Sequence, residues 1–297
     1  MKIGIDLGGS HISVGAIDES GKILSQEDIQ ILEEDKRNIK DIIENYILTS
    51  VKKIIEFHKV ESIGIAIPGT VNERKIIKAV NLGLENYDIV GRLSKEINLP
   101  IKIKNDAKCA AIAESTYGSI KEYENSLFLT LGTGIGGAVV FNHKLLDPKK
   151  VPGFEFGHMI ITKNGRLCNC GKRGCFERYG SMKVFKQEVI NELNLDEKIS
   201  GEDLLKKVEK EQQDPVVENI IDEFTENLSI GISNLINIFE PEAIGIGGSF
   251  TYYADILLPK IKSKILDGNL LFNKREDIII NAATLGNNAG MIGTTLV

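Results

Sequence analysis

The chain has no tryptophan, and its 297 residues include only four histidines and four cysteines. Any aromatic stacking on a ligand must therefore use phenylalanine, tyrosine or histidine. Acidic residues outnumber basic ones, 42 to 36, with no basic tract among them, so nucleic acid is not an expected partner. The sequence also lacks a signal pattern and any apolar run long enough to cross a bilayer. We therefore expect a cytoplasmic protein with no membrane partner.

Three of the four cysteines lie within residues 168–175. Thiols stay reduced in the cytoplasm, so this clustering favours a metal site over disulfide bonds. With a histidine shortly upstream, the segment offers three sulfur donors and one nitrogen donor, which suit a closed, tetrahedral and therefore structural Zn²⁺ site. A redox Cys-X-Cys pair and unpaired thiols are the alternatives. The predicted ligands are His158, Cys168, Cys170 and Cys175, and the carboxylates Glu155 and Glu177 flank them.

Hydrophobic periodicity predicts the same arrangement twice. Near the start, strands at 3–7 and 12–17 flank a glycine turn, and alternating helices and strands follow. The pattern recurs from residue 126, where a strand, a second glycine turn and a return strand precede further helices. These elements predict an α/β protein with a mixed sheet in each of two lobes. We expect an N-terminal lobe at 1–117, a C-terminal lobe at 118–285, and a terminal helix at 286–297 that returns to the first lobe.

Glycine-rich turns follow predicted strands at three places. Glycine lets backbone amides approach an anion closely, so turns from two lobes are suited to hold one polyphosphate. The carboxylate of Asp6 is suited to hold Mg²⁺ through water. Each turn taken alone is also typical of an ordinary hairpin or strand-to-helix loop, and no Walker A lysine follows. The turns contain Asp6, Gly8, Gly9 and Ser10; Gly132, Thr133, Gly134 and Gly136; and Gly247 and Gly248.

Asn105 and Asp106 lie where a predicted strand enters a predicted helix. Both residue types are favoured at helix N-caps, so a purely structural role is a strong alternative. A carboxylate at the end of a strand is also placed to accept a proton from an attacking hydroxyl. The sequence therefore makes Asp106 a candidate general base, with Asn105 orienting the same substrate.

These segments together resemble the ROK family, the repressor, open reading frame and kinase group, over nearly the whole chain. The zinc signature Cys168-x-Cys170-Gly-x-x-Gly-Cys175-x-Glu177 is the most specific of them. The segment 146–152 departs from the family, because it lacks the usual run of small residues beside the sugar site. The other matching segments are Asp6 to Ser10 and Leu131 to Gly137 (phosphate), Gly245 to Ser249 (adenosine), and Pro68-Gly69, Asn81-Leu82, Asn105-Asp106 and Glu155 to His158 (sugar).

The resemblance implies a two-lobed, actin-like ATPase fold of the ribonuclease H type. It implies a homodimeric enzyme that uses ATP and Mg²⁺ to phosphorylate the primary hydroxyl of a hexose or N-acetylhexosamine, with Asp106 as catalytic base and a structural Zn²⁺. The sugar is expected to contact Gly69, Asn81, Asn105, Asp106, Glu155, His158 and Glu177. ATP is expected at Asp6, Gly8, Gly9, Ser10, Gly132, Thr133, Gly134, Gly136, Gly247 and Gly248.

Two other functions match parts of this pattern. Sugar-binding, non-catalytic regulators of the same family carry a helix-turn-helix before the first Asp-x-Gly-Gly strand. Here that strand starts at residue 2, so we expect a kinase rather than a repressor. An actin-like filament or chaperone ATPase would share the glycine turns, but a zinc loop flanked by glutamates is not expected in it.

Overall fold

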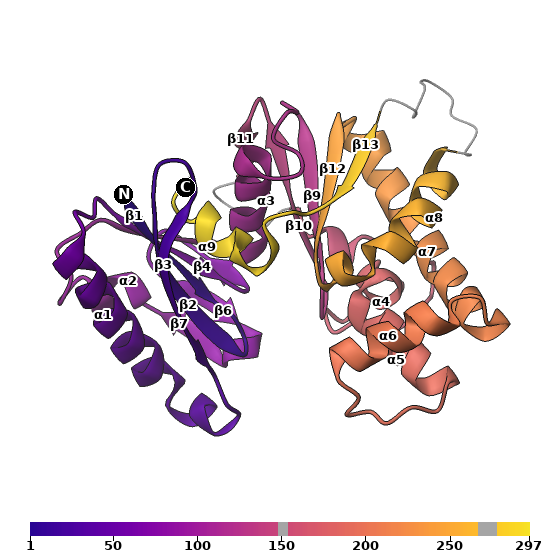
Figure 1. Ribbon diagram of the computed structural model, residues 1–297, viewed down its shortest axis with the longest axis horizontal. Coiled ribbons are helices and arrows are strands. Elements are labelled where there is room, and N and C mark those ends of the chain that lie inside the picture. The colour runs from indigo at the N-terminus through magenta and orange to yellow at the C-terminus, as the bar shows by residue number, and fades with distance from the viewer. Residues whose placement is uncertain (148–153, 267–277) are drawn as a thin grey trace. The chain divides into compact units, whose positions relative to one another are not determined.

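The computed structural model describes residues 1–147, 154–266 and 278–297. The chain divides into two compact units, one of Met1–Gly118 with Asn287–Val297 and the other of Ser119–Gly286 (Figure 1). The family resemblance predicts that the segment 146–152 borders the sugar site. Most of this segment lies outside the described residues. None of the helices in the described ranges has the length and apolar character needed to span a membrane.

The first unit contains a five-stranded mixed sheet in the order β3-β2-β1-β4-β8. Its antiparallel strands are β1 (Lys2–Leu7), β2 (His11–Ile17) and β3 (Ile23–Gln30), and β4 (Ile63–Ile67) and β8 (Ile101–Asn105) run parallel to β1. A second, antiparallel sheet consists of β5 (Thr70–Val71), β6 (Ile76–Ala79) and β7 (Leu84–Tyr87). Because β1, β4 and β8 are parallel, their carboxyl ends meet at one edge of the sheet, where α/β proteins bind ligands.

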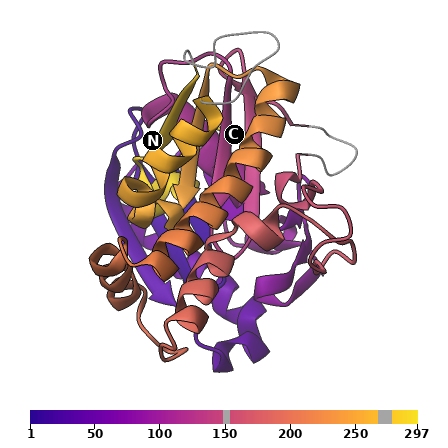
Figure 2. The same ribbon diagram turned by 90° about the vertical axis from the view of Figure 1, so that its right-hand side faces the viewer.

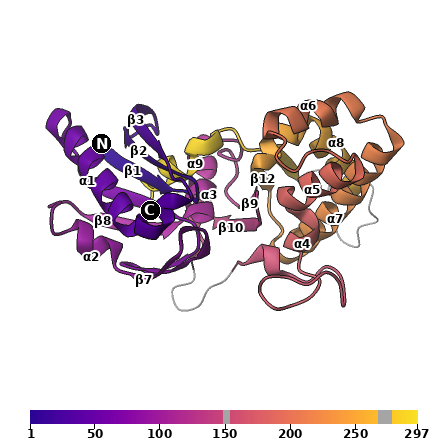
Figure 3. The ribbon, with the colours of Figure 1, turned by 90° about the horizontal axis from the view of Figure 1, so that it is seen from below.

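Helices cover both faces of the first sheet. α1 lies against one face (Figure 3). Its apolar residues follow the 3.6-residue helical period, and Ile43, Ile47 and Val51 are buried in the core of this unit. α3 and α9 pack against each other and on the opposite face. The helices and 3₁₀ turns are η1 (Glu34–Asn38), α1 (Ile39–Phe57), η2 (Val80–Leu82), α2 (Ile89–Leu93), α3 (Asp106–Tyr117), η6 (Gly286–Asn288) and α9 (Ala289–Gly293).

A row of glycines crosses the sheet beneath α9. Gly4 pairs with Gly15 on one neighbouring strand and with Gly64 on the other. A Cβ on Gly64 would lie 2.2 Å from the carbonyl oxygen of Thr294, and one on Gly4 would lie 2.3 Å from that of Met291. The missing side chains therefore let the C-terminal segment lie directly on the strands. Asp6 lies on this same face of β1, since side chains alternate along a strand.

The second unit repeats the strand order of the first, as β11-β10-β9-β12-β13. In each sheet the first three strands are antiparallel and the last two run parallel to the first. The duplication predicted from the two glycine turns is thus present in the topology. The strands are β9 (Ser126–Leu131), β10 (Ile135–Phe141), β11 (Lys144–Leu145), β12 (Ala243–Gly248) and β13 (Ile279–Ala282).

The core of the second unit forms around α7, which spans Pro215–Phe239. Asp214 caps this helix by accepting from the N–H of Val216, and proline at the first helical position starts it. α8 lies beside α7, and Lys260 on α8 donates to Asp222 on α7 at 2.7 Å (Figure 2). The helices and 3₁₀ turns are η3 (Phe156–His158), α4 (Glu177–Gly180), α5 (Met182–Glu192), α6 (Gly201–Glu211), α7, η4 (Ser249–Tyr253) and α8 (Ala254–Leu266).

We expect Gly64→Ala to destabilise the protein by about 1–3 kcal/mol, because the new methyl group overlaps backbone atoms that cannot rotate away. Gly201→Ala is the matched control, since no heavy atom lies within 4 Å of a Cβ at that position. Urea denaturation of both variants checks the prediction. An unfolding midpoint for Gly64→Ala as high as that of the control would contradict the close packing of α9.

Candidate functional site

In the first unit, two acidic residues meet at the carboxyl edge of the sheet. Asp6 lies near the end of β1, and Asp106 follows the last residue of β8 as the first residue of α3. The register of the parallel strands aligns these ends, because Asp6 pairs with Ala66 and Ala66 with Lys104. On its other side Asp6 is covered by α9, where a Cβ on Gly290 would lie 2.4 Å from Oδ2 of Asp6. Both carboxylates are therefore half-buried.

Hydrogen bonds fix the orientation of the Asp106 carboxylate. Its Oδ1 accepts from the backbone N–H of Ala107 at 2.8 Å and from Nδ2 of Asn105 at 3.0 Å. Nδ2 of Asn105 also donates to the carbonyl oxygen of Gly69 at 3.0 Å, and its Oδ1 caps α3 by accepting from the N–H of Lys108. The capping role and the positioning role of Asn105 are thus carried by different atoms of one side chain.

Burial makes both carboxyl groups weaker acids than usual. Desolvation raises the pKa of Asp106 to about 6, although the hydrogen bonds from Ala107 and Asn105 oppose this by favouring the charged form. Desolvation, followed by repulsion from Asp106, raises the pKa of Asp6 to about 7. Asp106 therefore ionises first and Asp6 second. A carboxylate with a pKa near 6 is a better proton acceptor than an ordinary one and is still charged at neutral pH.

The first glycine turn lies next to the predicted sugar segments. The N–H of Gly8 donates to the carbonyl of His11 at 2.8 Å, which closes the β1–β2 hairpin with Ser10 exposed at its tip. A Cβ on Gly9 would lie 3.2 Å from Cβ of Asn81. Gly69 has φ of +124° and would place a Cβ 2.3 Å from the carbonyl of Lys78, so only glycine fits there.

The structure brings six of the predicted residues of this unit into direct contact or close approach. Gly69, Asn105 and Asp106 are joined by hydrogen bonds, and Asp6 interacts with Asp106. Asn81 approaches Gly9 of the phosphate turn and is exposed, as a ligand contact should be.

In the second unit, the glycine turn is tighter than the sequence suggests. β10 begins at Ile135, so Gly136 pairs with Thr130 in the ladder instead of lying in the turn. The turn itself is Gly132–Gly134, closed by a 3.0 Å bond from the N–H of Gly132 to the carbonyl of Gly134. The strand glycines have a packing role, because the ring of Phe156 lies 2.6 Å from where a Cβ of Gly137 would be. Thr133 at the tip is exposed.

The predicted adenosine motif lies beside this turn. Gly247 and Gly248 belong to β12 and pair with Thr130 and Leu131, which directly precede the turn. Gly248 has φ of +74°, and a Cβ there would lie 2.5 Å from the carbonyl of Leu131. The two motifs therefore form one continuous backbone surface, and Gly248 lets β12 lie close against the end of β9.

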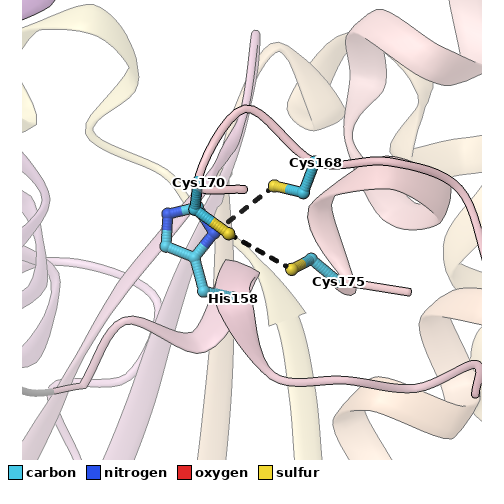
Figure 4. Close-up of side chains that lie close together, drawn as sticks. All are labelled: His158, Cys168, Cys170 and Cys175. Carbon is cyan, nitrogen blue, oxygen red and sulfur yellow. Dashed lines mark hydrogen bonds between the residues drawn. The ribbon is translucent and has the colours of Figure 1, made fainter. Parts of the chain in front are cut away.

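The four predicted metal ligands converge. Their donor atoms all lie within 4.8 Å of one another (Figure 4). Nδ1 of His158 lies 3.7 Å from Sγ of Cys168, and Sγ of Cys170 lies 3.6 Å from Sγ of Cys175. A tetrahedral Zn²⁺ with zinc–sulfur bonds of about 2.3 Å spaces its sulfur ligands by about 3.8 Å. The donor set and its spacing therefore fit zinc. With four protein ligands, such a site is closed and has a structural role.

The two flanking glutamates differ in their surroundings. Glu155 is exposed and precedes η3. Glu177 is half-buried at the start of α4, and its Oε2 accepts from the backbone N–H of Ile135 at 3.1 Å. The sequence predicted Glu177 to be a sugar ligand but gave no sign of this contact with the end of the second glycine turn. It also missed the packing of Gly290 on Asp6. No local pattern reveals either contact, since 42 residues or more separate the partners.

The repeated sheets, their glycine turns and the paired carboxylates define the actin-like ATPase fold, in its ribonuclease H-type, two-lobed form. The ROK family model matches residues 2–297, so the chain belongs to the ROK family.

Relatives and solved structures agree with this assignment. The chain is 31% identical to the glucokinase of Halalkalibacterium halodurans, over 98% of this chain and 92% of that protein. It is 28% identical to the xylose repressor of Bacillus subtilis, over 99% of this chain and 76% of that protein. A ROK glucokinase from Streptomyces griseus, solved with glucose and AMPPNP, superposes with a TM-score of 0.81 at 27% identity, covering 99% and 97% of the two chains.

We expect the purified protein to carry one zinc ion per chain and Cys170→Ala to lose it. Cys170 is exposed, so its removal takes away a ligand without opening a cavity. Cys109→Ala is the control, because Cys109 is buried in α3 of the first unit and is not one of the four ligands. Elemental mass spectrometry measures the metal content. Equal zinc content in the two variants would refute the site.

Proposed function

We propose that this chain is an ATP-dependent sugar kinase that phosphorylates the primary hydroxyl of a hexose or N-acetylhexosamine. The observation that carries the proposal is the half-buried Asp106, held by Asn105 and Ala107 with a pKa of about 6. This carboxylate stands at the ligand-binding edge of a sheet and next to a phosphate-type glycine turn. The similarity to glucokinases is consistent with it.

In the proposed reaction, Asp106 acts as general base. Oδ1 already accepts two hydrogen bonds, so we assign Oδ2 to the substrate proton. As that proton leaves the sugar hydroxyl, the hydroxyl oxygen forms a bond to the γ-phosphorus of ATP. The bond from this phosphorus to the β,γ-bridging oxygen breaks, and ADP leaves with the electron pair. Positioning and charge neutralisation supply most of the acceleration.

The proposed sugar contacts come from several segments. Asn105 donates from a side chain already fixed by Gly69, which limits the entropy lost on binding. His158 has one ring nitrogen directed at the cysteine cluster, so the other is available to a sugar hydroxyl. Zinc ligation would hold this ring rigid, as sugar selection requires. The remaining proposed contacts are Gly69, Asn81, Glu155 and Glu177.

The proposed nucleotide contacts are the two glycine turns and the adenosine motif. Backbone amides around Gly8–Ser10 and Gly132–Gly134 suit phosphate oxygens, and we assign the nucleoside to Gly247–Gly248, which lie beside the second turn. The carboxylate of Asp6 would hold Mg²⁺ through water, since oxygen ligands are those that Mg²⁺ prefers. When bound, Mg²⁺ would neutralise phosphate charge and the charge on Asp6, whose ionisation the protein alone disfavours.

An ADP-release assay across sugars tests the function. Glucose, mannose and their N-acetylamino derivatives are expected to give a phosphorylated product, whereas xylose, which as a pyranose lacks a primary hydroxyl, is not. Xylose is an informative control because a xylose repressor is among the relatives. Sugar binding without turnover on any sugar would favour a non-catalytic regulator instead. A cytoplasmic location and a homodimer remain part of the proposal.

We expect Asp106→Asn to lower kcat by at least about 100-fold, the usual contribution of a general base. The amide keeps the shape and the hydrogen-bonding oxygen, so sugar affinity measured by calorimetry is expected to stay within a few-fold. Asp41→Asn, an exposed carboxylate on α1, is the matched control and should keep full activity. Near-normal turnover of Asp106→Asn would reject the assignment.

The rate is expected to depend on pH through Asp106. Its pKa of about 6 lies above that of an ordinary aspartate. As the solution is acidified, Asp106 is therefore protonated, and can no longer act as a base, at a higher pH than an ordinary aspartate would be. We expect kcat/KM for the sugar to be level above about pH 7 and to fall about fivefold between pH 6 and pH 5. Initial rates at saturating MgATP, with circular dichroism to confirm folding at each pH, check this. A level profile down to pH 5 would contradict it.

A further inference from the structure

The carboxylate of Glu177 lies directly against the second phosphate turn. Its Oε2 accepts from the N–H of Ile135, the first residue after the turn, at 3.1 Å. A Cβ on Gly134 would lie 2.2 Å from the same oxygen. Gly134 therefore makes room for the carboxylate, and the carboxylate in turn fixes the backbone at the end of the turn.

A second segment of the zinc loop contacts Ile135 from its carbonyl side. A Cβ on Gly157 would lie 2.4 Å from the carbonyl oxygen of Ile135. Gly157 directly precedes the zinc ligand His158, and Glu177 follows the zinc ligand Cys175 by two residues. The segment that carries Cys175, the last metal ligand, thus approaches the N–H of Ile135. The segment that carries His158, the first metal ligand, approaches the C=O of the same residue.

The two segments of the zinc loop are themselves paired. Ile160 and Cys175 form an isolated bridge, and the N–H of Phe176 donates to the carbonyl of Met159 at 2.8 Å. The side chain of Phe176 is buried against Gly231 of α7. Zinc would join His158 to Cys175 across this pair. Its removal would take away the link between the two segments that passes through His158 and Cys175.

We propose that Glu177 is a positioning residue for the second phosphate turn, and that the zinc loop through it sets the affinity for the triphosphate of ATP. This inference rests on the proposed function and adds to it, because the same carboxylate was expected only to bind sugar. Oε2 is used by the turn, which leaves Oε1 for a sugar hydroxyl. One metal-held residue would then contribute to both substrate sites.

Calorimetry with Mg²⁺ and AMPPNP in the absence of sugar tests the role of Glu177. Glu177→Ala is expected to weaken AMPPNP binding about tenfold, the effect of losing one charge-assisted hydrogen bond. Glu177→Gln keeps an oxygen acceptor for the N–H of Ile135 and should stay within about twofold to threefold of the unchanged protein. Glu155→Ala is the matched control, an exposed glutamate of the same loop, and should lower sugar affinity while leaving AMPPNP affinity unchanged.

The same titrations distinguish the possible failures. AMPPNP affinity for Glu177→Ala within twofold of the unchanged protein, with zinc content intact, overturns the inference and leaves the proposed kinase untouched. Tighter binding in either Glu177 variant also overturns it, because the carboxylate would then act only by repelling phosphate. Failure of the unchanged protein to bind AMPPNP at all overturns both proposals.

Hydrogen exchange gives a readout that does not depend on substrates. Zinc removal is expected to speed amide exchange in the peptide 131–141, and Glu177→Ala to do the same with zinc in place. Peptides from β1 and β2 in the first unit and from α8 in the second serve as internal controls and should not change. Unchanged exchange at 131–141 after zinc removal overturns the link between the metal and the turn.

If Glu177→Ala does not fold, Gly134→Ala supplies the test. Its methyl group would overlap Oε2 of Glu177 and displace it, so AMPPNP binding should weaken. When Gly134→Ala is combined with Glu177→Gln, the overlap with the side chain at 177 remains. When it is combined with Glu177→Asp, the shorter side chain relieves the overlap, and AMPPNP affinity should partly recover. Equal AMPPNP affinity of Gly134→Ala and the unchanged protein overturns the proposal.

Discussion

The removal of two carboxylates from water is the constraint on which the first unit depends. Asp6 is half-buried because α9 lies on a row of glycines and brings Gly290 against it. Asp106 is half-buried at the start of α3, where Asn105 and Ala107 hold its Oδ1. Desolvation raises the pKa of both groups, and the repulsion between them keeps Asp6 the weaker acid. Close backbone packing on one face of a sheet thus sets the proton affinity at its edge.

The second unit also holds polar groups in fixed positions, but by a different kind of interaction. Its sheet has the same strand order, but a donor set that fits zinc holds the polar groups instead of a packed C-terminal helix. The loop carrying these ligands approaches the end of the second glycine turn at the backbone N–H and C=O of Ile135. A metal suits this position because the loop is short, and several of its residues are too exposed to be fixed by a hydrophobic core.

Much of the fold followed from local patterns. The helix Pro215–Phe239 has an aspartate cap, a proline start and a 3.6-residue apolar period, which act within a few residues and were readable in advance. The tight turn at Gly132–Gly134 was not, because Gly136 and Gly137 belong to the strand but look like turn glycines in the sequence. The short strand Leu84–Tyr87 also escaped prediction, since its pairing with β6 supplies its stability.

The sequence by itself determined which groups we predict to carry the chemistry: the metal-ligand cluster, the glycine turns and the residues Asn105 and Asp106. Those signals are local, because metal ligation, close backbone approach and helix capping all depend on residues near one another in the chain. Only the tertiary structure decided which oxygen of Asp106 is occupied, how far burial raises its pKa, and that Glu177 contacts the N–H of Ile135. Desolvation and long-range contacts arise when distant segments pack together, and no single segment encodes them.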